Sequence, residues 1–258
     1  MGKGVILVAV AATLAVAAPS ASADRSPDGS KNDGKTVRCT GTVLPDFNPG
    51  IVTGPVDNVI VPANNFCILE GAQVKHDVLV GANGGLGAEN SSVGHDIVAI
   101  QPWEIETGNN GPLTVGHDFV ISGPDAENGA QGYDICDTSV GHDLKITGTS
   151  VLYEIEVGDI GPQNNEFCTT SPSPPVWVGH DLVVTGNSAG KIDIGNNTVV
   201  HDLVVKDNTL MSDYPLVSGI GVDDNKVGHD ATCLNSVPLS KDGPEDGPNV
   251  VGGRNRGC

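Results

Sequence analysis

The feature that most constrains this fold is one tetrapeptide, Val-x-His-Asp, which recurs seven times and contains every histidine of the chain. The residue before the histidine is glycine in five copies, and Lys75 and Val200 are the exceptions. Successive histidines are 19, 22, 25, 38, 21 and 28 residues apart. Repeats of this length are typical of solenoids, in which each repeat adds one layer. The copies carry His76 and Asp77, His95 and Asp96, His117 and Asp118, His142 and Asp143, His180 and Asp181, His201 and Asp202, and His229 and Asp230.

Apolar residues flank each tetrapeptide at alternate positions, which is the period of a β-strand with one buried face. The residues two after each histidine are Val78, Ile97, Phe119, Leu144, Leu182, Leu203 and Ala231. We therefore interpret Gly-His-Asp as a corner between two strands. Glycine is expected to supply a positive φ there, and the aspartate to bond the backbone just ahead of it. A glycine such as Gly123, Gly148 or Gly186 often closes the unit.

The predicted fold class is all-β, a single right-handed parallel β-helix (solenoid) with irregular corner loops. The clearest coil comprises 181–185, 191–194 and 198–200. Stacked coils would bury a continuous core that no single coil can form. A β-sandwich also has short alternating strands, but it does not explain seven copies of one tetrapeptide. Residues 59–61 and 67–69 suggest one more coil upstream, 171–175 a loop, and 242–258 a loop-like segment over the last coil.

The first 23 residues are expected to be an export signal. Lys3 precedes a mostly apolar run over 5–17, and Ala21-Ser22-Ala23 is a small-x-small cleavage site. The predicted organisation is a signal peptide at 1–23, a flexible polar lead-in at 24–38, and the β-helix with disulfide-tied ends at 39–258. The chain would then be secreted, to the extracellular space or the cell surface, with no insertion into the membrane.

The charge balance speaks against nucleic acid as a partner. The chain has 13 Lys and Arg against 32 Asp and Glu, whereas nucleic-acid binding requires clustered basic residues. The acidity fits a soluble exported protein, or one that collects cations.

Six cysteines in an exported chain indicate disulfides, and six cysteines allow 15 pairings. Neighbours in sequence are the preferred partners: Cys39 with Cys67, Cys136 with Cys168, and Cys233 with Cys258. Zinc binding would need close cysteine pairs, and the chain has none.

The repeat resembles that of the small, exported, glycine-rich β-helical proteins of actinobacteria, whose units read Val-x-Gly-Asn-Leu-x-Val. Here the unit is Val-Gly-His-Asp-Leu-Val-Val at 178–184, and the segment 249–258 resembles the terminal segment of that group. The resemblance covers 39–258 and implies a right-handed β-helix, with no established activity. The repeat is more distantly similar to bactofilin-type scaffolds, which lack an export signal and disulfides.

Stacked corners would form a column of histidines beside a column of aspartates, for which three interpretations remain open. The ladder is structural, or it binds a divalent cation, or one His-Asp pair acts as a catalytic base. Identical residues in a straight column point in parallel rather than at one ion, and seven copies are unlike a catalytic group. Trp103 and Trp177 are the only obvious candidates for stacking on a sugar. The sequence thus favours a non-catalytic structural or surface-interaction protein without a cofactor, whose partner is cell-wall polymer or further copies of itself. The alternatives are a carbohydrate-active β-helix enzyme, of lyase or hydrolase type, and cation binding by the ladder.

Overall fold

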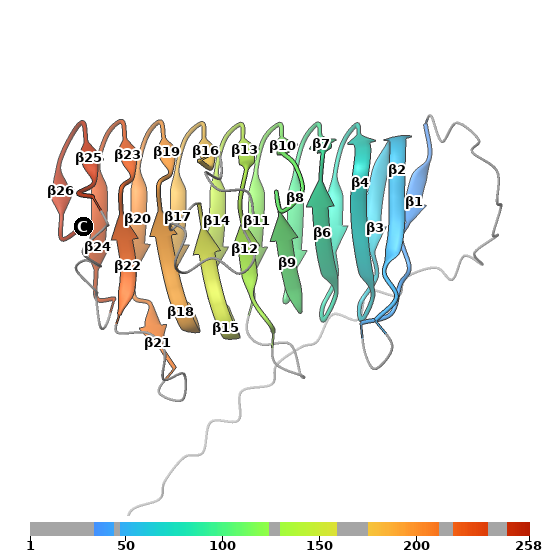
Figure 1. The fold of residues 1–258 in the computed structure, drawn as a ribbon, viewed down its shortest axis with the longest axis horizontal. Coiled ribbons are helices and arrows are strands. Elements are labelled where there is room, and N and C mark those ends of the chain that lie inside the picture. Colours follow the sequence, from blue (N-terminus) through green and yellow to red (C-terminus); the bar gives the residue numbers. More distant parts are fainter. Residues whose placement is uncertain (1–33, 44–46, 124–129, 159–174, 212–218, 237–246) are drawn as a thin grey trace, which may run out of the picture. The chain divides into compact units, whose positions relative to one another are not determined.

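The computed structural model describes residues 34–43, 47–123, 130–158, 175–211, 219–236 and 247–258. These residues form an all-β structure of long parallel sheets (Figure 1). None of them belongs to a helix long and apolar enough to cross a bilayer. The predicted signal peptide at 1–23 lies outside these residues, as do residues 171–174 of the loop predicted at 171–175.

The first sheet takes one short strand from each successive repeat, and neighbouring strands pair in parallel. Within the described ranges it has ten strands. In pairing order they are β1 (Thr36–Arg38), β3 (Asn58–Val61), β5 (Val78–Val80), β8 (Ile97–Ile100), β11 (Phe119–Ser122), β14 (Leu144–Thr147), β17 (Leu182–Thr185), β20 (Leu203–Lys206), β24 (Ala231–Leu234) and β26 (Asn255–Arg256).

The second sheet takes the other strands of the same repeats, which number sixteen in the part of the chain described. Seven of the strands that lead into the corners are β7 (Ser91–Val93), β10 (Leu113–Val115), β13 (Thr138–Val140), β16 (Trp177–Val178), β19 (Thr198–Val199), β23 (Lys226–Val227) and β25 (Val250–Val251). The remaining strands are β2 (Gly50–Val56), β4 (Phe66–Val74), β6 (Gly85–Glu89), β9 (Glu104–Thr107), β12 (Tyr133–Ile135), β15 (Ser150–Val157), β18 (Ser188–Gly195), β21 (Thr209–Leu210) and β22 (Ile220–Asp223).

The core lies between the sheets and is made by the alternating apolar positions that the repeat predicts. The seven residues two after each histidine are all 0% exposed. The valines before the corners are buried too, from Val74 at 2% exposed to Val227 at 3%. Equivalent residues pair from layer to layer, as Leu144 does with Leu182 and Leu182 with Leu203. Each repeat therefore buries its apolar face by stacking on the next, which is the packing of repeat proteins.

Both ends of the sheets extend further than the sequence suggests. Strand β1 pairs with β3, so residues 36–38 belong to the first sheet and not to a flexible lead-in. At the other end, β25 pairs with β23 and β26 with β24. The described part of the final segment therefore adds a further layer of strands, and does not fold over the last layer as a loop.

Two of the three predicted disulfides are confirmed, Cys39–Cys67 and Cys233–Cys258. Each joins residues about one repeat apart, 28 and 25 residues in sequence, and each ties an outermost strand region to the neighbouring layer. Cys136 is buried, but its predicted partner Cys168 lies outside the described residues, so that pairing stays a prediction.

Buried asparagines form two further columns that the sequence analysis did not identify. In one, the Asn187 side-chain amide donates to the Asn208 Oδ1 at 3.0 Å and to the Ile146 carbonyl at 3.0 Å. In the other, Asn197 donates to the Asn225 Oδ1 at 2.8 Å. Asn187, Asn197, Asn208 and Asn225 are at most 1% exposed. Because each amide bonds both its neighbouring layer and the backbone, these columns satisfy polar groups that the turns would otherwise bury unpaired.

Candidate functional site: a histidine-aspartate ladder and a buried carboxylate cluster

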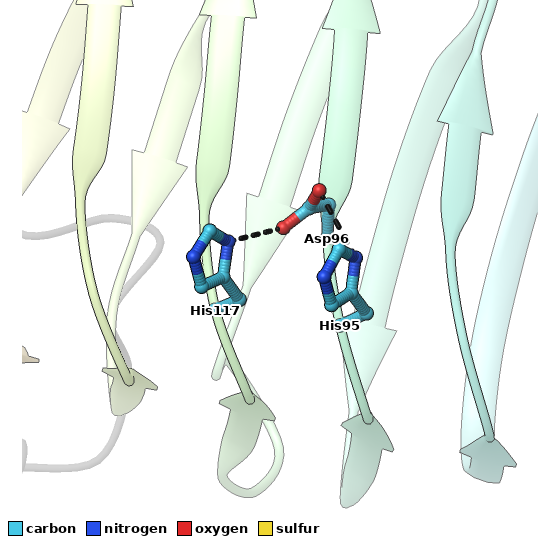
Figure 2. A group of neighbouring side chains, drawn as sticks. All are labelled: His95, Asp96 and His117. Carbon is cyan, nitrogen blue, oxygen red and sulfur yellow. Dashed lines mark hydrogen bonds and ion pairs between the residues drawn. The ribbon is translucent and has the colours of Figure 1, made fainter.

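The predicted corners do form one continuous ladder. Each histidine from His95 to His229 places its Nδ1 2.7 to 3.0 Å from the Oδ1 of the aspartate in the preceding layer. Figure 2 shows the unit: the Asp96 carboxylate contacts the ring nitrogens of both His95 and His117. The rings stack with centroids 4.6 to 5.1 Å apart and planes within 6° of parallel. All seven histidines are described, and six rings form the stack; His76 joins the column through its backbone.

The aspartates hold neighbouring layers together, and do not cap their own turns as the sequence analysis expects. The Oδ1 of Asp96, for example, accepts the His117 Nδ1–H and also the backbone N–H of Asp118 at 3.0 Å. The same pair of bonds recurs from Asp77 to Asp202. One carboxylate thus fixes both the histidine and the backbone of the next layer.

The ladder is closed at both ends by residues outside the tetrapeptide. At one end, the Asn58 Oδ1 accepts the Asp77 backbone N–H at 3.2 Å. At the other, Arg254 occupies the aspartate position, donates its backbone N–H to Asp230 at 2.8 Å and forms an ion pair with it at 2.7 Å. Asn58 thus supplies an acceptor for the backbone at the first layer, and Arg254 supplies a positive charge for the Asp230 carboxylate at the last layer.

At the five corners that carry glycine, this residue allows a close approach between layers rather than a positive φ, which corrects the sequence interpretation. None of the five corner glycines is among the residues with positive φ. A Cβ on Gly116 would lie 2.2 Å from the carbonyl oxygen of Gly94 in the layer beside it, and Gly141 and Gly179 meet the same obstacle. The positive φ falls instead at the glycines that close the unit, such as Gly148 at 63° and Gly186 at 68°.

Replacement of a corner glycine should therefore destabilise the stack. We expect Gly116→Ala to lower the free energy of unfolding by about 2 kcal/mol, because the new methyl group must push two layers apart. Gly87→Ala is the matched control, since its Cβ would meet only the side chains of Ile68, at 3.4 Å, and Phe66, at 3.8 Å, and should cost less than about 1 kcal/mol. Urea unfolding of both variants measures the difference; equal losses would contradict this role of the corner.

The ladder favours the charged form of His117 and His201. The hydrogen bond to Asp96 raises the pKa of His117, and the bond to Asp181 does the same for His201. Burial opposes ionisation of Asp143, but hydrogen bonds from Lys145, His180 and the Asp181 backbone lower its pKa to about 2. Since an ionised carboxylate only accepts, Nδ1 must carry a hydrogen throughout the ladder.

The geometry of the ladder does not suit a metal centre. Each His-Asp-His group brings three potential ligand atoms within 4.8 Å of one another. However, a zinc ion that binds two imidazoles at about 2.1 Å needs the two nitrogens within about 4.2 Å of each other. The parallel rings are 4.6 to 5.1 Å apart, and their Nδ1–H groups are already used by aspartates. The arrangement works as a hydrogen-bonded and charged column.

A second cluster, which the sequence analysis missed, lies on the outward-facing positions of β9, β12, β15 and β18. It contains six carboxylates and one amine, here called the carboxylate cluster. Asp134 is in register with Glu106 on one side and Glu156 on the other, and Glu156 is in register with Asp193. Its members are Glu104, Glu106, Asp134, Glu154, Glu156, Asp193 and Lys191.

The cluster is unusually buried for outward-facing charged residues. Asp134 is 4% exposed, Glu156 1% and Lys191 9%. Burial, with the repulsion of neighbouring carboxylates, raises the pKa of Glu104 to about 8 and that of Asp134 to about 9. Burial also raises the pKa of Glu106 and of Glu156, although the ammonium group of Lys191 beside Glu156 opposes the rise. Several of these groups therefore carry protons at neutral pH in the folded protein.

The two candidate sugar-stacking tryptophans are placed differently from each other. Trp103 is 8% exposed and packs edge-to-face on Phe66, with ring centroids 6.3 Å apart. Trp177 is 40% exposed on β16. A buried ring cannot stack on a polymer, so the structure removes Trp103 from the candidates.

Comparisons of this chain with protein-family models, with curated proteins and with solved structures find no match.

Proposed function

We propose that this chain is a secreted, non-catalytic structural or surface-interaction protein, built as a single right-handed parallel β-helix that presents a repetitive acidic surface. The parallel in-register sheets support the closed solenoid. The right hand is supported by the handedness of parallel crossovers in general. Two disulfides are compatible with an extracellular location.

One observation carries the proposal: the repeated residues that could do chemistry are engaged in one structural column. In every layer from Asp77 to Asp202, the carboxylate is bonded to the histidine and to the backbone of the next layer. A catalytic base must be free to take a proton from a substrate. Groups that join every layer to the next are what a rigid repetitive scaffold requires.

The rival proposal, a carbohydrate-active enzyme, predicts clustered carboxylates with a lysine or arginine along an open groove. The carboxylate cluster has this composition, and Lys191 contacts Glu156 and approaches Glu154 at 3.7 Å. Its central members are almost completely buried, however, with Asp134 at 4% and Glu156 at 1% exposed. A polymer chain needs exposed groups, so the burial favours the non-catalytic proposal.

The proposed partners are cell-wall polymer or further copies of this chain, and the test combines sedimentation with imaging. The purified mature protein should co-sediment with insoluble cell-wall material, or form filaments visible by electron microscopy. Protein with reduced and alkylated cysteines is the control for folding. Release of reducing ends or unsaturated products from a polysaccharide panel, abolished by Asp134→Asn, would replace this proposal with the enzyme.

A further inference from the structure

The most unusual group in the molecule outside the ladder is the carboxylate cluster, because it brings six carboxyl groups together, some of them almost completely buried, with a single amine to match them. Lys191 serves one end, where it contacts Glu156 and lies 3.7 Å from Glu154 and 4.0 Å from Asp193. Among the residues that the structure describes, no lysine, arginine or histidine forms an ion pair with Glu104, Glu106 or Asp134. Uncompensated buried carboxylates are costly, so they normally bind a cation or carry a proton.

Two oxygen atoms in the cluster are buried and have no hydrogen-bond partner. They are the Oδ1 of Asp134 and the Oε2 of Glu156. The two residues are 4% and 1% exposed and are adjacent in register on β12 and β15. A buried acceptor without a donor costs about 1–3 kcal/mol, so two such atoms on paired residues of neighbouring strands favour a ligand that both can bind.

The register places three carboxylates in a row. Glu106, Asp134 and Glu156 occupy equivalent positions on β9, β12 and β15, and neighbouring strands are about 4.8 Å apart. Glu104 and Glu154, two residues away on β9 and β15, contribute to the field at Asp134. Asp134 is therefore the centre of an all-oxygen group that comes from three strands.

We propose that Asp134 and Glu156 bind one divalent cation between their unpartnered oxygens, with Glu106 as the adjoining carboxylate on the other side of Asp134; the ion prefers oxygen ligands, and calcium is the best match. Calcium binds carboxylates at about 2.4 Å in irregular geometry, so two oxygens on neighbouring strands about 4.8 Å apart can hold one ion between them. Magnesium needs about 2.1 Å and near-ideal octahedral geometry, which a flat row of strands does not supply. The cluster offers neither imidazole nor thiolate ligands for zinc. This inference does not depend on the proposed scaffold function.

Calcium titration of the mature protein, freed of metal with a chelator, tests the site by calorimetry. We expect one ion per chain and a higher melting temperature with calcium than with magnesium. Asp134→Asn should weaken calcium binding at least tenfold, and Glu106→Gln should weaken it as well, which covers the case that one variant folds poorly. Asp77→Asn, which changes a ladder carboxylate, is the matched control and should leave calcium affinity unchanged.

Terbium provides a second readout that a purely structural effect would not change. Trp103 directly precedes Glu104 in the sequence, so excitation of tryptophan should sensitise the emission of bound terbium. Trp103→Phe should reduce this emission while calcium affinity stays within about twofold, and calcium should displace the terbium. No binding at 10 mM calcium, equal binding in Asp134→Asn, or loss of binding in Asp77→Asn would each overturn the proposal.

Discussion

Raising the pH from 5 to 8 in the presence of chelator should lower the free energy of unfolding by about 4 kcal/mol or more. The pKa of Asp134 is about 9 in the folded protein and that of Glu104 about 8, against ordinary values of 3.8 and 4.5. Between pH 5 and 8 the unfolded chain has lost these protons while the folded chain keeps them. Stability must then fall as the pH rises, by about 1.4 kcal/mol per pH unit for each proton retained.

The other groups with shifted pKa values either lower the stability further as the pH rises, or keep the same protonation state in both folded and unfolded protein between pH 5 and 8. The raised pKa of His117 and of His201 adds stability at low pH, which is lost as the pH rises through their folded values. The lowered pKa values of Asp118, Asp143 and Asp202 change stability only at pH values below their ordinary 3.8. The carboxyl groups interact, so their contributions do not simply add, and one retained proton sets the smallest expected slope.

Chemical unfolding at a series of pH values measures this slope. Asp134→Asn should reduce the slope of unfolding free energy against pH by about 1.4 kcal/mol per pH unit, which is the contribution of one retained proton. Asp207→Asn is the control, because hydrogen bonding to Asn235 lowers the pKa of this exposed residue and it stays ionised in both states. Stability that is level from pH 5 to 8, or an unchanged slope in Asp134→Asn, would show that the cluster is not buried in its protonated form.

The second large loss of stability is expected on replacement of Asp143, the most buried aspartate of the ladder. Asp143→Ala should cost about 3–5 kcal/mol, because it leaves buried or partly buried donors without an acceptor. The Asp143 carboxylate is 7% exposed and accepts bonds from Lys145 at 2.6 Å, from His180 at 2.8 Å and from the Asp181 backbone at 3.1 Å.

Two variants separate the contribution of the ladder from a general effect of mutation. Asp77→Ala removes the same pair of bonds at the end of the ladder, where the carboxylate is 39% exposed, and should cost about 1 kcal/mol or less. Asp143→Asn should cost less than Asp143→Ala, since Asn58 already serves as the acceptor for a backbone N–H in the first layer. Equal losses for Asp143→Ala and Asp77→Ala, measured by urea unfolding, would mean that the aspartates do not hold the layers together.

The stacking of the repeats could be predicted from the sequence because one tetrapeptide and its alternating apolar neighbours recur together. This pattern fixes which residues lie above one another, and hence the histidine and aspartate columns. The sequence did not reveal that the aspartate bonds the next layer instead of its own turn, because both bonds use the same carboxylate. The sequence also suggested a positive φ at the corner glycines. Their actual role is a close approach between layers, such as that of Gly116 to Gly94, which leaves no local signature in the sequence.

A signal for the asparagine columns was present in the sequence. Asn187 and Asn208 each lie seven residues after a ladder histidine, and Asn197 and Asn225 each lie two before a corner valine. Aligning the repeats on their histidines would have shown these columns.

The carboxylate cluster could not be predicted in the same way. Its strands follow the corners at different distances, so the sequence does not say that Asp134 pairs with Glu106 and Glu156. The alternation of Glu104 with Glu106, and of Glu154 with Glu156, is what an ordinary solvent-exposed strand face looks like. Only the register and the burial distinguish this face from such a strand.

Distances between spin labels along one column test the central claim, the in-register stacking of the repeats, most directly. Gln73, Thr114 and Lys226 are exposed and occupy equivalent positions in their layers. Parallel pairing connects these positions from layer to layer in the order Gln73, Ser92, Thr114, Ser139, Trp177, Thr198 and Lys226. Introduced cysteines can be labelled selectively where the native cysteines are paired in disulfides.

Electron–electron double resonance should give a separation that depends on the number of layers and not on the length of chain between the labels. Thr114→Cys with Lys226→Cys spans four layers, or about 19 Å, and Gln73→Cys with Lys226→Cys spans six, or about 29 Å, at about 4.8 Å per layer. A difference of about 10 Å between the two pairs is the predicted result. Similar separations for both pairs, or broad distributions without this step, would contradict the stacked ladder.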